Sequence, residues 1–187
     1  PSIVGGYVFE TFGKTSQFSI GLPFAWADAS ALINGAPAET SRTGFGDIRM
    51  RYSILLLGGD ALTLPEFAKA ERKTILGASL SMTAPTGQYY NHKLINLGTY
   101  RWAFKPEIAL SQPVGKRWLF DLYAGVWFFT TNNQFYPESS TRDQKPLGSF
   151  QGHISYNFTP RMWAAINTTY YTGGNTVVNG IESNDRQ

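Results

Sequence analysis

The segment Gln17-Phe18-Ser19-Ile20-Gly21-Leu22-Pro23-Phe24-Ala25-Trp26 alternates between small or polar residues and large apolar residues. The same alternation returns in residues 47–56 and in residues 100–111. A period of two residues is typical of an extended strand that has one apolar face and one polar face. The sequence therefore predicts an all-β chain, whose class depends on what the apolar face meets.

Eight strands are expected along the chain. Several of them span 12 to 16 residues, whereas soluble strands are usually about 5–6 residues long and tilted membrane strands need about 9–11. The expected strands are residues 3–13, 17–27, 44–57, 72–85, 99–112, 116–131, 147–158 and 161–173.

The connections between these strands alternate in length. Short turns are predicted at 14–16, 113–115 and 159–160, and long polar loops at 28–43, 86–98, 132–146 and 174–187. Segment 58–71 breaks the rule because it is long yet belongs to the short-turn end, and its residues 64–69 could form one helical turn. Short turns at one end and long loops at the other are typical of bacterial outer-membrane barrels.

A soluble β-sandwich or a lipocalin-like barrel would also explain the alternation. However, the polar faces of residues 77–83 and 149–157 are small and mostly neutral, and bulky side chains such as Trp118 and Phe120 would overfill a small barrel. Aromatic residues also gather near the strand ends, where they would form a girdle at the lipid headgroups. They are Phe24, Trp26, Tyr100, Trp102, Trp118, Phe158, Trp163, Tyr170 and Tyr171.

We therefore predict an antiparallel, up-and-down transmembrane β-barrel in the bacterial outer membrane, with its apolar face toward lipid. Residues 1–187 form one domain, and both ends read as cut, so the chain is expected to be a fragment of a larger barrel. A fragment would leave unpaired sheet edges at residues 3–13 and 161–173, which a complete barrel must close.

Composition narrows the function class. Charged residues make up 16% of the chain, against about 25% in soluble domains, and no Lys/Arg run supports nucleic-acid binding at a net charge of +3. The chain has no cysteine, no metal-ligand set and no phosphate-binding glycine loop, since Gly5-Gly6 and Gly58-Gly59 are isolated pairs. No cofactor is expected, and the composition leaves the oligomeric state open.

Several motifs resemble those of the MetA-pathway phenol-degradation family of outer-membrane transporters. The resemblance covers residues 44–173 and implies uptake of small hydrophobic or aromatic compounds across the outer membrane. The motifs are Gly44-Phe45-Gly46-Asp47-Ile48-Arg49, Ala84-Pro85-Thr86-Gly87, Ala109-Leu110-Ser111, Arg117-Trp118, and the segment from Ser155 to Trp163 that contains Thr159-Pro160-Arg161.

Charged residues on the expected inner face are the candidate functional residues. They could form a constriction that selects or orients a solute, or they could only pair with one another, which we favour slightly. Asp47 could instead only fix the entry of its strand. Tyr123 and Trp127 could stack on an aromatic solute or simply fill the barrel. The charged candidates are Asp47, Arg49, Arg51, Arg101, Lys105, Glu107 and Asp121.

Two other functions are weighed against a channel. His153 and Ser155 lie two residues apart on one strand face, the spacing of a base and a nucleophile in lipid-cutting hydrolases of the outer membrane. That face is the inner one, away from the bilayer, so a hydrogen-bonded lining is the better interpretation, and no enzymatic activity is expected. The long outer loops, 132–146 above all, could also make the chain a surface adhesin or receptor.

Overall fold

The computed structural model describes residues 1–33, 36–93, 95–136, 139–159 and 161–183. One large antiparallel sheet runs in the order β1-β2-β4-β5-β6-β7-β10-β11, so eight strands follow one another as the sequence predicts. Its strands are β1 (Ser2–Thr11), β2 (Lys14–Ile33), β3 (Ala36–Phe45), β4 (Ile48–Leu57), β5 (Ile75–Ala84), β6 (Ala103–Val114), β7 (Trp118–Phe129), β10 (Leu147–Thr159) and β11 (Met162–Gly173), of which β3 pairs only with β2.

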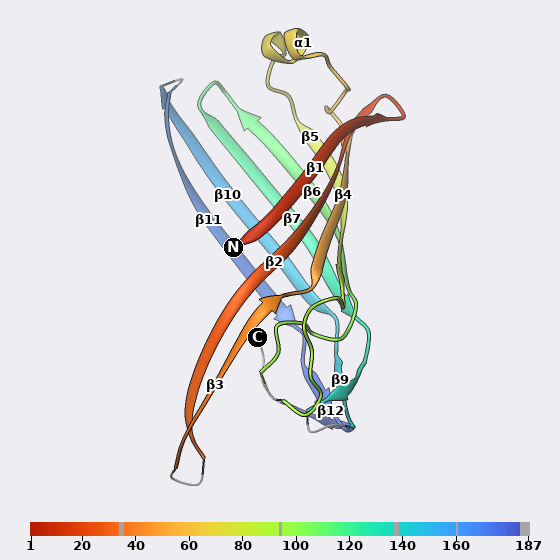
Figure 1. Cartoon of the computed structure of the whole chain (residues 1–187). Helices are drawn as coiled ribbons and strands as arrows, with labels where there is room; N and C mark the ends of the chain where they lie inside the picture. The colour runs from red at the N-terminus through yellow and green to blue at the C-terminus, as the bar shows by residue number, and fades with distance from the viewer. Residues whose placement is uncertain (34–35, 94, 137–138, 160, 184–187) are drawn as a thin grey trace.

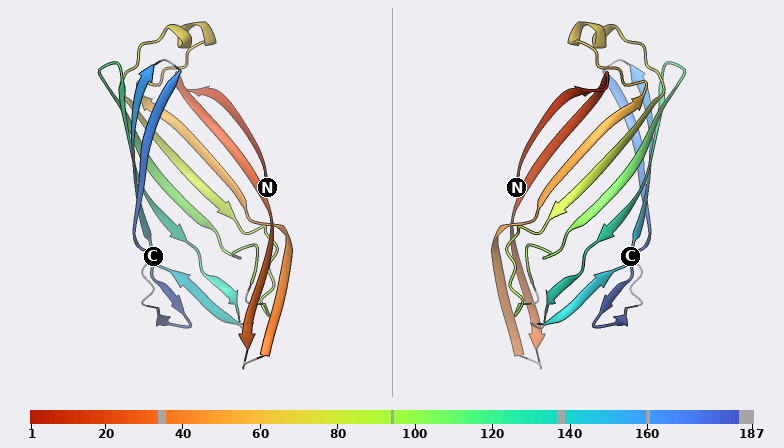
Figure 2. Two further views of the ribbon diagram at one scale, coloured as in Figure 1. Left: turned by 90° about the vertical axis from the view of Figure 1, so that its left-hand side faces the viewer. Right: turned by 90° about the vertical axis from the view of Figure 1, so that its right-hand side faces the viewer.

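The sheet curls about one axis into a half-barrel (Figures 1 and 2). Neighbouring strands of the large sheet run antiparallel. The short turns lie at one end of the strands and most of the longer connections lie at the other, whereas the long connection with α1 between β4 and β5 lies at the short-turn end (Figure 1). The two edges of the sheet are β1 and β11, and neither has a second partner among the described strands. The unpaired edges predicted at residues 3–13 and 161–173 are confirmed.

The strand register divides side chains between two faces. In β6, the odd-numbered Ala103, Lys105 and Glu107 are buried, whereas the even-numbered Ile108 is 59% exposed. The pairing carries this parity through β2, β4, β5, β7, β10 and β11, so the odd-numbered residues of these strands form the concave inner face. In β1 the parity is reversed, because Tyr7 pairs with the outward Phe18.

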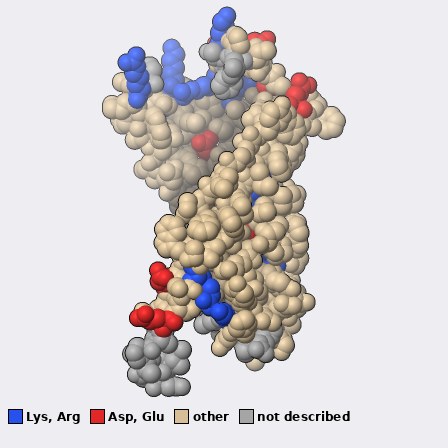
Figure 3. All heavy atoms as spheres, in the orientation of Figure 1, with Lys and Arg blue, Asp and Glu red and all other residues tan. Residues whose placement is uncertain are grey.

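The outer face is apolar and exposed. Large side chains such as Leu122 and Ile166 are 57% and 76% exposed, and buried apolar residues among the described ones are limited to Ala84, Ala103 and Leu147. The surface between the two ends of the strands carries few charges, and Lys and Arg gather at the short-turn end (Figure 3). Leaving so much apolar surface in water would cost about 25 cal/mol per Å², so this face is unlike the surface of an ordinary soluble domain.

Two of the aromatic residues predicted to form the girdle do not lie on the outer face. Trp163 pairs with Asn157 and Tyr171 pairs with Ser149, so both belong to the inner face of β11. Trp118, Phe158 and Tyr170 are even-numbered and exposed on the outer face, as expected.

The prediction of a loop at residues 28–43 is wrong, because β2 and β3 remain paired through most of this segment. We call this paired extension, residues 24–33 and 36–45, the hairpin arm. The register runs without a break from Phe24 opposite Phe45 to Ile33 opposite Ala36. The arm projects past the rest of the sheet at the long-loop end (Figure 1). Residues 34–35 at its tip lie outside the described residues.

The short turns lie slightly away from their predicted positions. The turn predicted at 14–16 is formed by Phe12 and Gly13, whose φ angles of 52° and 73° match a two-residue hairpin turn with both residues left-handed. The turn predicted at 113–115 begins only at Gly115, since β6 continues to Val114. Pro160 of the third turn lies outside the described residues.

Two more predicted segments contain additional strands. Within 132–146 and 174–187, β8 (Asn132–Phe135), β9 (Ser140–Gln144), β12 (Thr176–Val178) and β13 (Ile181–Glu182) form a small sheet at the long-loop end. Residues 94, 137–138 and 184–187 of the predicted loops lie outside the described residues. The strand predicted from residue 99 begins only at Ala103, because Tyr100 adopts a left-handed φ of 53°.

The helical turn expected within 58–71 is α1 (Leu64–Lys69). Its N-terminus is capped by Glu66. The Glu66 carboxylate accepts hydrogen bonds from the Thr63 backbone N–H at 2.8 Å and from the Thr63 hydroxyl at 2.7 Å. In the described part of the chain, helical structure nowhere reaches the length and apolar character needed to cross a membrane.

Candidate functional site: the inner face of the half-barrel

Three of the predicted charged residues meet on the inner face. The Glu107 carboxylate contacts the Lys105 ammonium at 2.6 Å through Oε2 and the Arg51 guanidinium at 3.2 Å through Oε1. The side chains of Glu107 and Lys105 are only 5% and 11% exposed. We call Arg51, Lys105 and Glu107 the charged cluster.

Small residues around the cluster let its long side chains meet. Arg51 on β4 reaches Glu107 on β6 by crossing β5, where it also donates to the Ser79 hydroxyl at 3.1 Å. On the other side, a Cβ atom at Gly125 of β7 would lie 3.2 Å from the Glu107 side chain and 3.3 Å from that of Lys105. The inward side chains of β5 are small and neutral, as predicted, and they leave space for the long side chains of the charged cluster.

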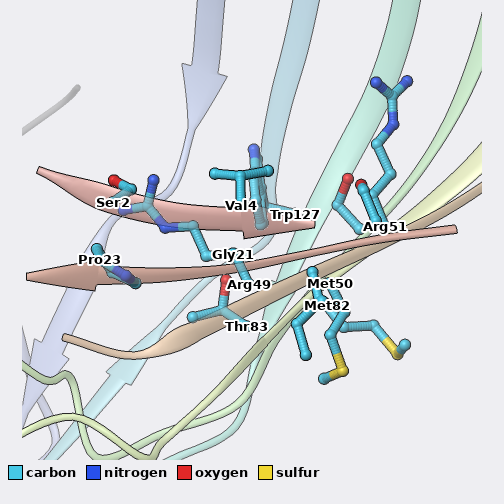
Figure 4. A pocket seen from close by; sticks show the side chains of 13 residues that line it. Ser2, Val4, Gly21, Pro23, Arg49, Met50, Arg51, Met82, Thr83 and Trp127 are labelled. Carbon is cyan, nitrogen blue, oxygen red and sulfur yellow. The ribbon is translucent and has the colours of Figure 1, made fainter. Parts of the chain in front are cut away.

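Arg49 extends the positive side of this region. It lines a hollow of about 330 Å³ together with Arg51, Thr83 and Trp127. In Figure 4, Met50 and Met82 point to the opposite side of the sheet from Arg51, as the alternating register requires. Arg51 and Lys105 pair with the one carboxylate of Glu107, and Arg49 adds a third positive charge beside them, so the region keeps an excess of positive charge.

Trp127 and Tyr123 have partners within the wall. The Lys105 ammonium lies 5.3 Å from the centroid of the Trp127 ring, which also stacks on Phe129. Tyr123 meets the His153 ring edge-on, with 5.4 Å between the ring centroids. Both aromatic side chains therefore line the inner face and contact their neighbours in it.

Asp121 lies apart from the charged cluster, opposite Ser111 and His153 in the strand register. His153 itself is hydrogen-bonded through Nδ1 to the Asn167 amide oxygen at 2.6 Å. Ser155 faces inward and lines the chamber described below. An inward Ser155 is remote from the lipid that a lipid-cutting nucleophile would have to reach.

Asp47 holds a loop in place. Its carboxylate accepts hydrogen bonds from the Gly87 N–H at 2.9 Å, the Thr99 N–H at 2.8 Å and the Thr99 hydroxyl at 2.7 Å. A Cβ atom at Gly98 would lie 2.9 Å from the Asp47 carboxylate, so only glycine allows this close approach. Asp47 thereby fastens the ends of loop 86–98 to the start of β4.

Arg101 is also separate from the cluster, at the long-loop end beyond the start of β6. Its guanidinium donates to the Gln144 side chain at 2.6 Å and lies 4.4 Å from the centroid of the Phe129 ring. The structure therefore brings together Arg51, Lys105 and Glu107, with Arg49 beside them, and leaves Asp47, Arg101 and Asp121 elsewhere.

An apolar chamber of about 730 Å³ lies at the opposite, short-turn end of the inner face. Leu55, Ile75, Leu119 and Trp163 line it from the strands. Segment 58–73 closes its end with Leu62 and Ala70, next to the charged residues Asp60, Glu71, Arg72 and Lys73. The chamber was not predicted from the sequence. One sequence feature marks it: at the short-turn ends of the strands, the inward positions carry large apolar residues instead of small polar ones. These residues are Leu55, Ile75 and Leu119.

Segment 58–73 is fastened to the barrel end by ion pairs. The Asp60 carboxylate contacts the ammonium groups of Lys14 at 2.5 Å and Lys73 at 2.9 Å. Hydrogen bonds and charge from these two lysines lower the pKa of Asp60 from 3.8 to about 2. Backbone bonds from Thr15 to Gly59 and from Ala61 to Gly13 add to this attachment.

We expect segment 58–73 to loosen in acid. Because the pKa of Asp60 is lowered on folding, its contribution is present above about pH 4 and is lost as the pH falls toward 2. The chain has no cysteine, so a spin label on Ala70→Cys reports this segment alone. Label mobility should rise between pH 5 and pH 2, and the Asp60→Asn variant should already be mobile at pH 7. Glu71→Gln, a matched change in the same segment, should keep the acid transition, and an immobile label in Asp60→Asn would contradict the expectation.

The fold and the two-faced wall together define a class of protein, the transmembrane β-barrel. A solved outer membrane channel from Pseudomonas putida F1 has the same fold, with a TM-score of 0.77 and 23% sequence identity. The match covers 99% of this chain and 64% of that channel, so the chain spans less than two thirds of its length. This fold agrees with the outer-membrane location expected from the sequence.

Residues 4–187 match the model of the family described as "Putative MetA-pathway of phenol degradation", and the chain belongs to that family. The resemblance seen in the motifs of residues 44–173 is thereby confirmed. No curated protein matches the chain.

Proposed function

We propose that this chain forms part of the wall of an outer-membrane channel that admits small hydrophobic or aromatic compounds, without enzymatic activity. Residues 1–187 act as one barrel domain within a larger closed barrel. The observation that carries the proposal is the apolar chamber of about 730 Å³ at the end of an otherwise polar inner face. A solute that has crossed the polar region finds apolar surface there before it leaves the barrel.

The comparisons support this proposal in outline. The channel from Pseudomonas putida F1 shares the fold, and the family description refers to phenol degradation. The charged cluster supports a selective region, because an excess of positive charge on a narrow inner face favours anions and excludes cations. In this proposal lipid is the partner of the outer face, and no nucleic acid is expected as a partner.

Liposome swelling tests the proposal. Vesicles containing the protein should admit phenyl glucoside, a neutral aromatic solute that crosses bare lipid poorly, faster than they admit sucrose. The Ser155→Trp variant fills the chamber from β10 and should slow phenyl glucoside entry by at least about tenfold, a change of 1.4 kcal/mol in the barrier.

Thr168→Trp is the matched control, since Thr168 pairs with Gly152 on the lipid face of β11, where a tryptophan contacts lipid. It should leave the entry rate unchanged. Entry of phenyl glucoside no faster than in protein-free vesicles would overturn the proposal, as would equal rates in Ser155→Trp and Thr168→Trp.

A further inference from the structure

A second pocket, far from the apolar chamber, lies at the long-loop end of the barrel. It encloses about 200 Å³ between residues 89–93 and 96–101 on one side and residues 132–136 and Arg142 on the other. Three positively charged side chains line it, those of Lys93, Arg101 and Arg142, and none of its lining residues carries a carboxylate.

The Arg101 guanidinium in this pocket is incompletely paired. Its Nη2 donates to Gln144, but its Nη1 is buried without a hydrogen-bond partner. Burial and the neighbouring charge of Arg142 lower the pKa of Arg101 to about 10, so the group stays charged near neutral pH. A buried cation with a free donor and a like charge beside it is stabilised by an anion.

Aromatic side chains form the remaining wall. Tyr89 and Tyr136 line the pocket, and the Arg142 guanidinium lies 5.1 Å from the centroid of the Phe135 ring. Tyr89 stacks on Tyr100 with 5.0 Å between centroids. The pocket thus offers flat apolar surface next to positive charge.

The pocket is held in shape without a ligand. The Asn132 side chain, 2% exposed, donates to the Tyr89 hydroxyl at 2.9 Å and to the Thr99 carbonyl at 3.0 Å. The Tyr89 hydroxyl donates in turn to the Gln134 carbonyl at 3.0 Å. Asp47 secures Thr99 from the other side, so that carboxylate is already engaged. A preformed pocket loses little affinity to ordering on binding.

We propose that this pocket binds a single-ring aromatic carboxylate, with the carboxylate on Arg101 and Arg142 and the ring against the tyrosines. A volume of about 200 Å³ is below the roughly 300–1,000 Å³ of sites for drug-sized ligands, which limits the occupant to about one ring. The inference rests on the proposed channel function and names its substrate class. The pocket captures the anion at the outer mouth, and the positive excess of Arg49, Arg51 and Lys105 lies farther along the same inner face.

Binding of benzoate to the full chain in detergent micelles, followed by isothermal titration calorimetry, tests the site. Benzoate should bind at least about tenfold more tightly than benzamide, its neutral analogue, and than acetate, which lacks the ring. Arg101→Gln and Arg142→Gln should each weaken benzoate binding by at least about tenfold. Arg142→Gln leaves the Arg101–Gln144 hydrogen bond in place, so it reports on the site even where Arg101→Gln disturbs the loop.

Lys116→Gln, the same change of charge in a turn at the opposite end, is the matched control and should bind benzoate as the unaltered chain does. Equal affinity for benzoate and benzamide, or unchanged binding in Arg142→Gln, would overturn the site. Phenyl glucoside is neutral and its entry is measured separately. If the protein admits phenyl glucoside but does not bind benzoate, the channel proposal stands and only the proposed anion pocket is rejected.

Discussion

Replacement of Glu107 by glutamine is expected to lower the free energy of unfolding by about 3–5 kcal/mol, the usual cost of removing one member of a buried ion pair. The Glu107 carboxylate contacts two cations, and the Lys105 side chain that it leaves behind is only 11% exposed. Among the described residues, the Lys105 ammonium has no carboxylate within salt-bridge distance other than that of Glu107. In the variant this buried charge therefore loses its counter-ion.

Urea unfolding of the protein from lipid vesicles, followed by tryptophan fluorescence, measures this loss. Glu71→Gln removes the same charge from an exposed loop position and should change stability by less than about 0.5 kcal/mol. The double variant Glu107→Gln/Lys105→Met removes both partners and should recover more than half of the loss. Equal unfolding midpoints for Glu107→Gln and Glu71→Gln would show that the pair is not a stabilising contact.

An arginine in place of Ile108 is expected to cost about 2–4 kcal/mol, the penalty measured for a cation on the lipid face near the bilayer midplane. Ile108 lies in the middle of β6, points outward and is 59% exposed. If that face met water, an exposed Ile→Arg change would cost almost nothing. The substitution therefore separates a lipid surrounding from an aqueous one.

Gln151→Arg supplies the control for this variant. Gln151 lies on the inner face of β10, where it pairs with Tyr123. An added arginine there remains in the aqueous interior and should cost less than about 1 kcal/mol in the same vesicle unfolding measurement. Similar losses for Ile108→Arg and Gln151→Arg would contradict the assignment of the two faces.

Alternation is a local property, and it predicted the strands and their faces well. Each residue of β6 and β7 points to one side or the other by geometry alone, so Lys105, Glu107 and Tyr123 could be assigned inward from the sequence. Which charges touch depends on register and on the room left by neighbours. The contact of Arg51 with Glu107 needs Ser79 between them, and neither strand's sequence contains that information by itself.

The errors have equally specific causes. The arm of β2 and β3 was not predicted because residues 28–33 and 36–43 lack the large apolar side chains at every second position that mark residues 17–26. Tyr100, whose backbone is left-handed, stacks on Tyr89, and no local sequence pattern predicts this contact between separated segments. The chamber likewise forms from β4, β5, β7 and β11 together, so its residues become a group only after the sheet curls.

The hairpin arm gives the outer mouth an uneven rim. At about 3.3 Å per residue, the ten residues from Phe24 to Ile33 carry it roughly 30 Å along its own direction, a length similar to the hydrocarbon core of a bilayer. The arm reaches past β9 and β12, which lie at the same end of the sheet (Figure 1). Large particles that approach the long-loop end would therefore contact the arm before they reached the inner face, whereas small molecules would pass beside it.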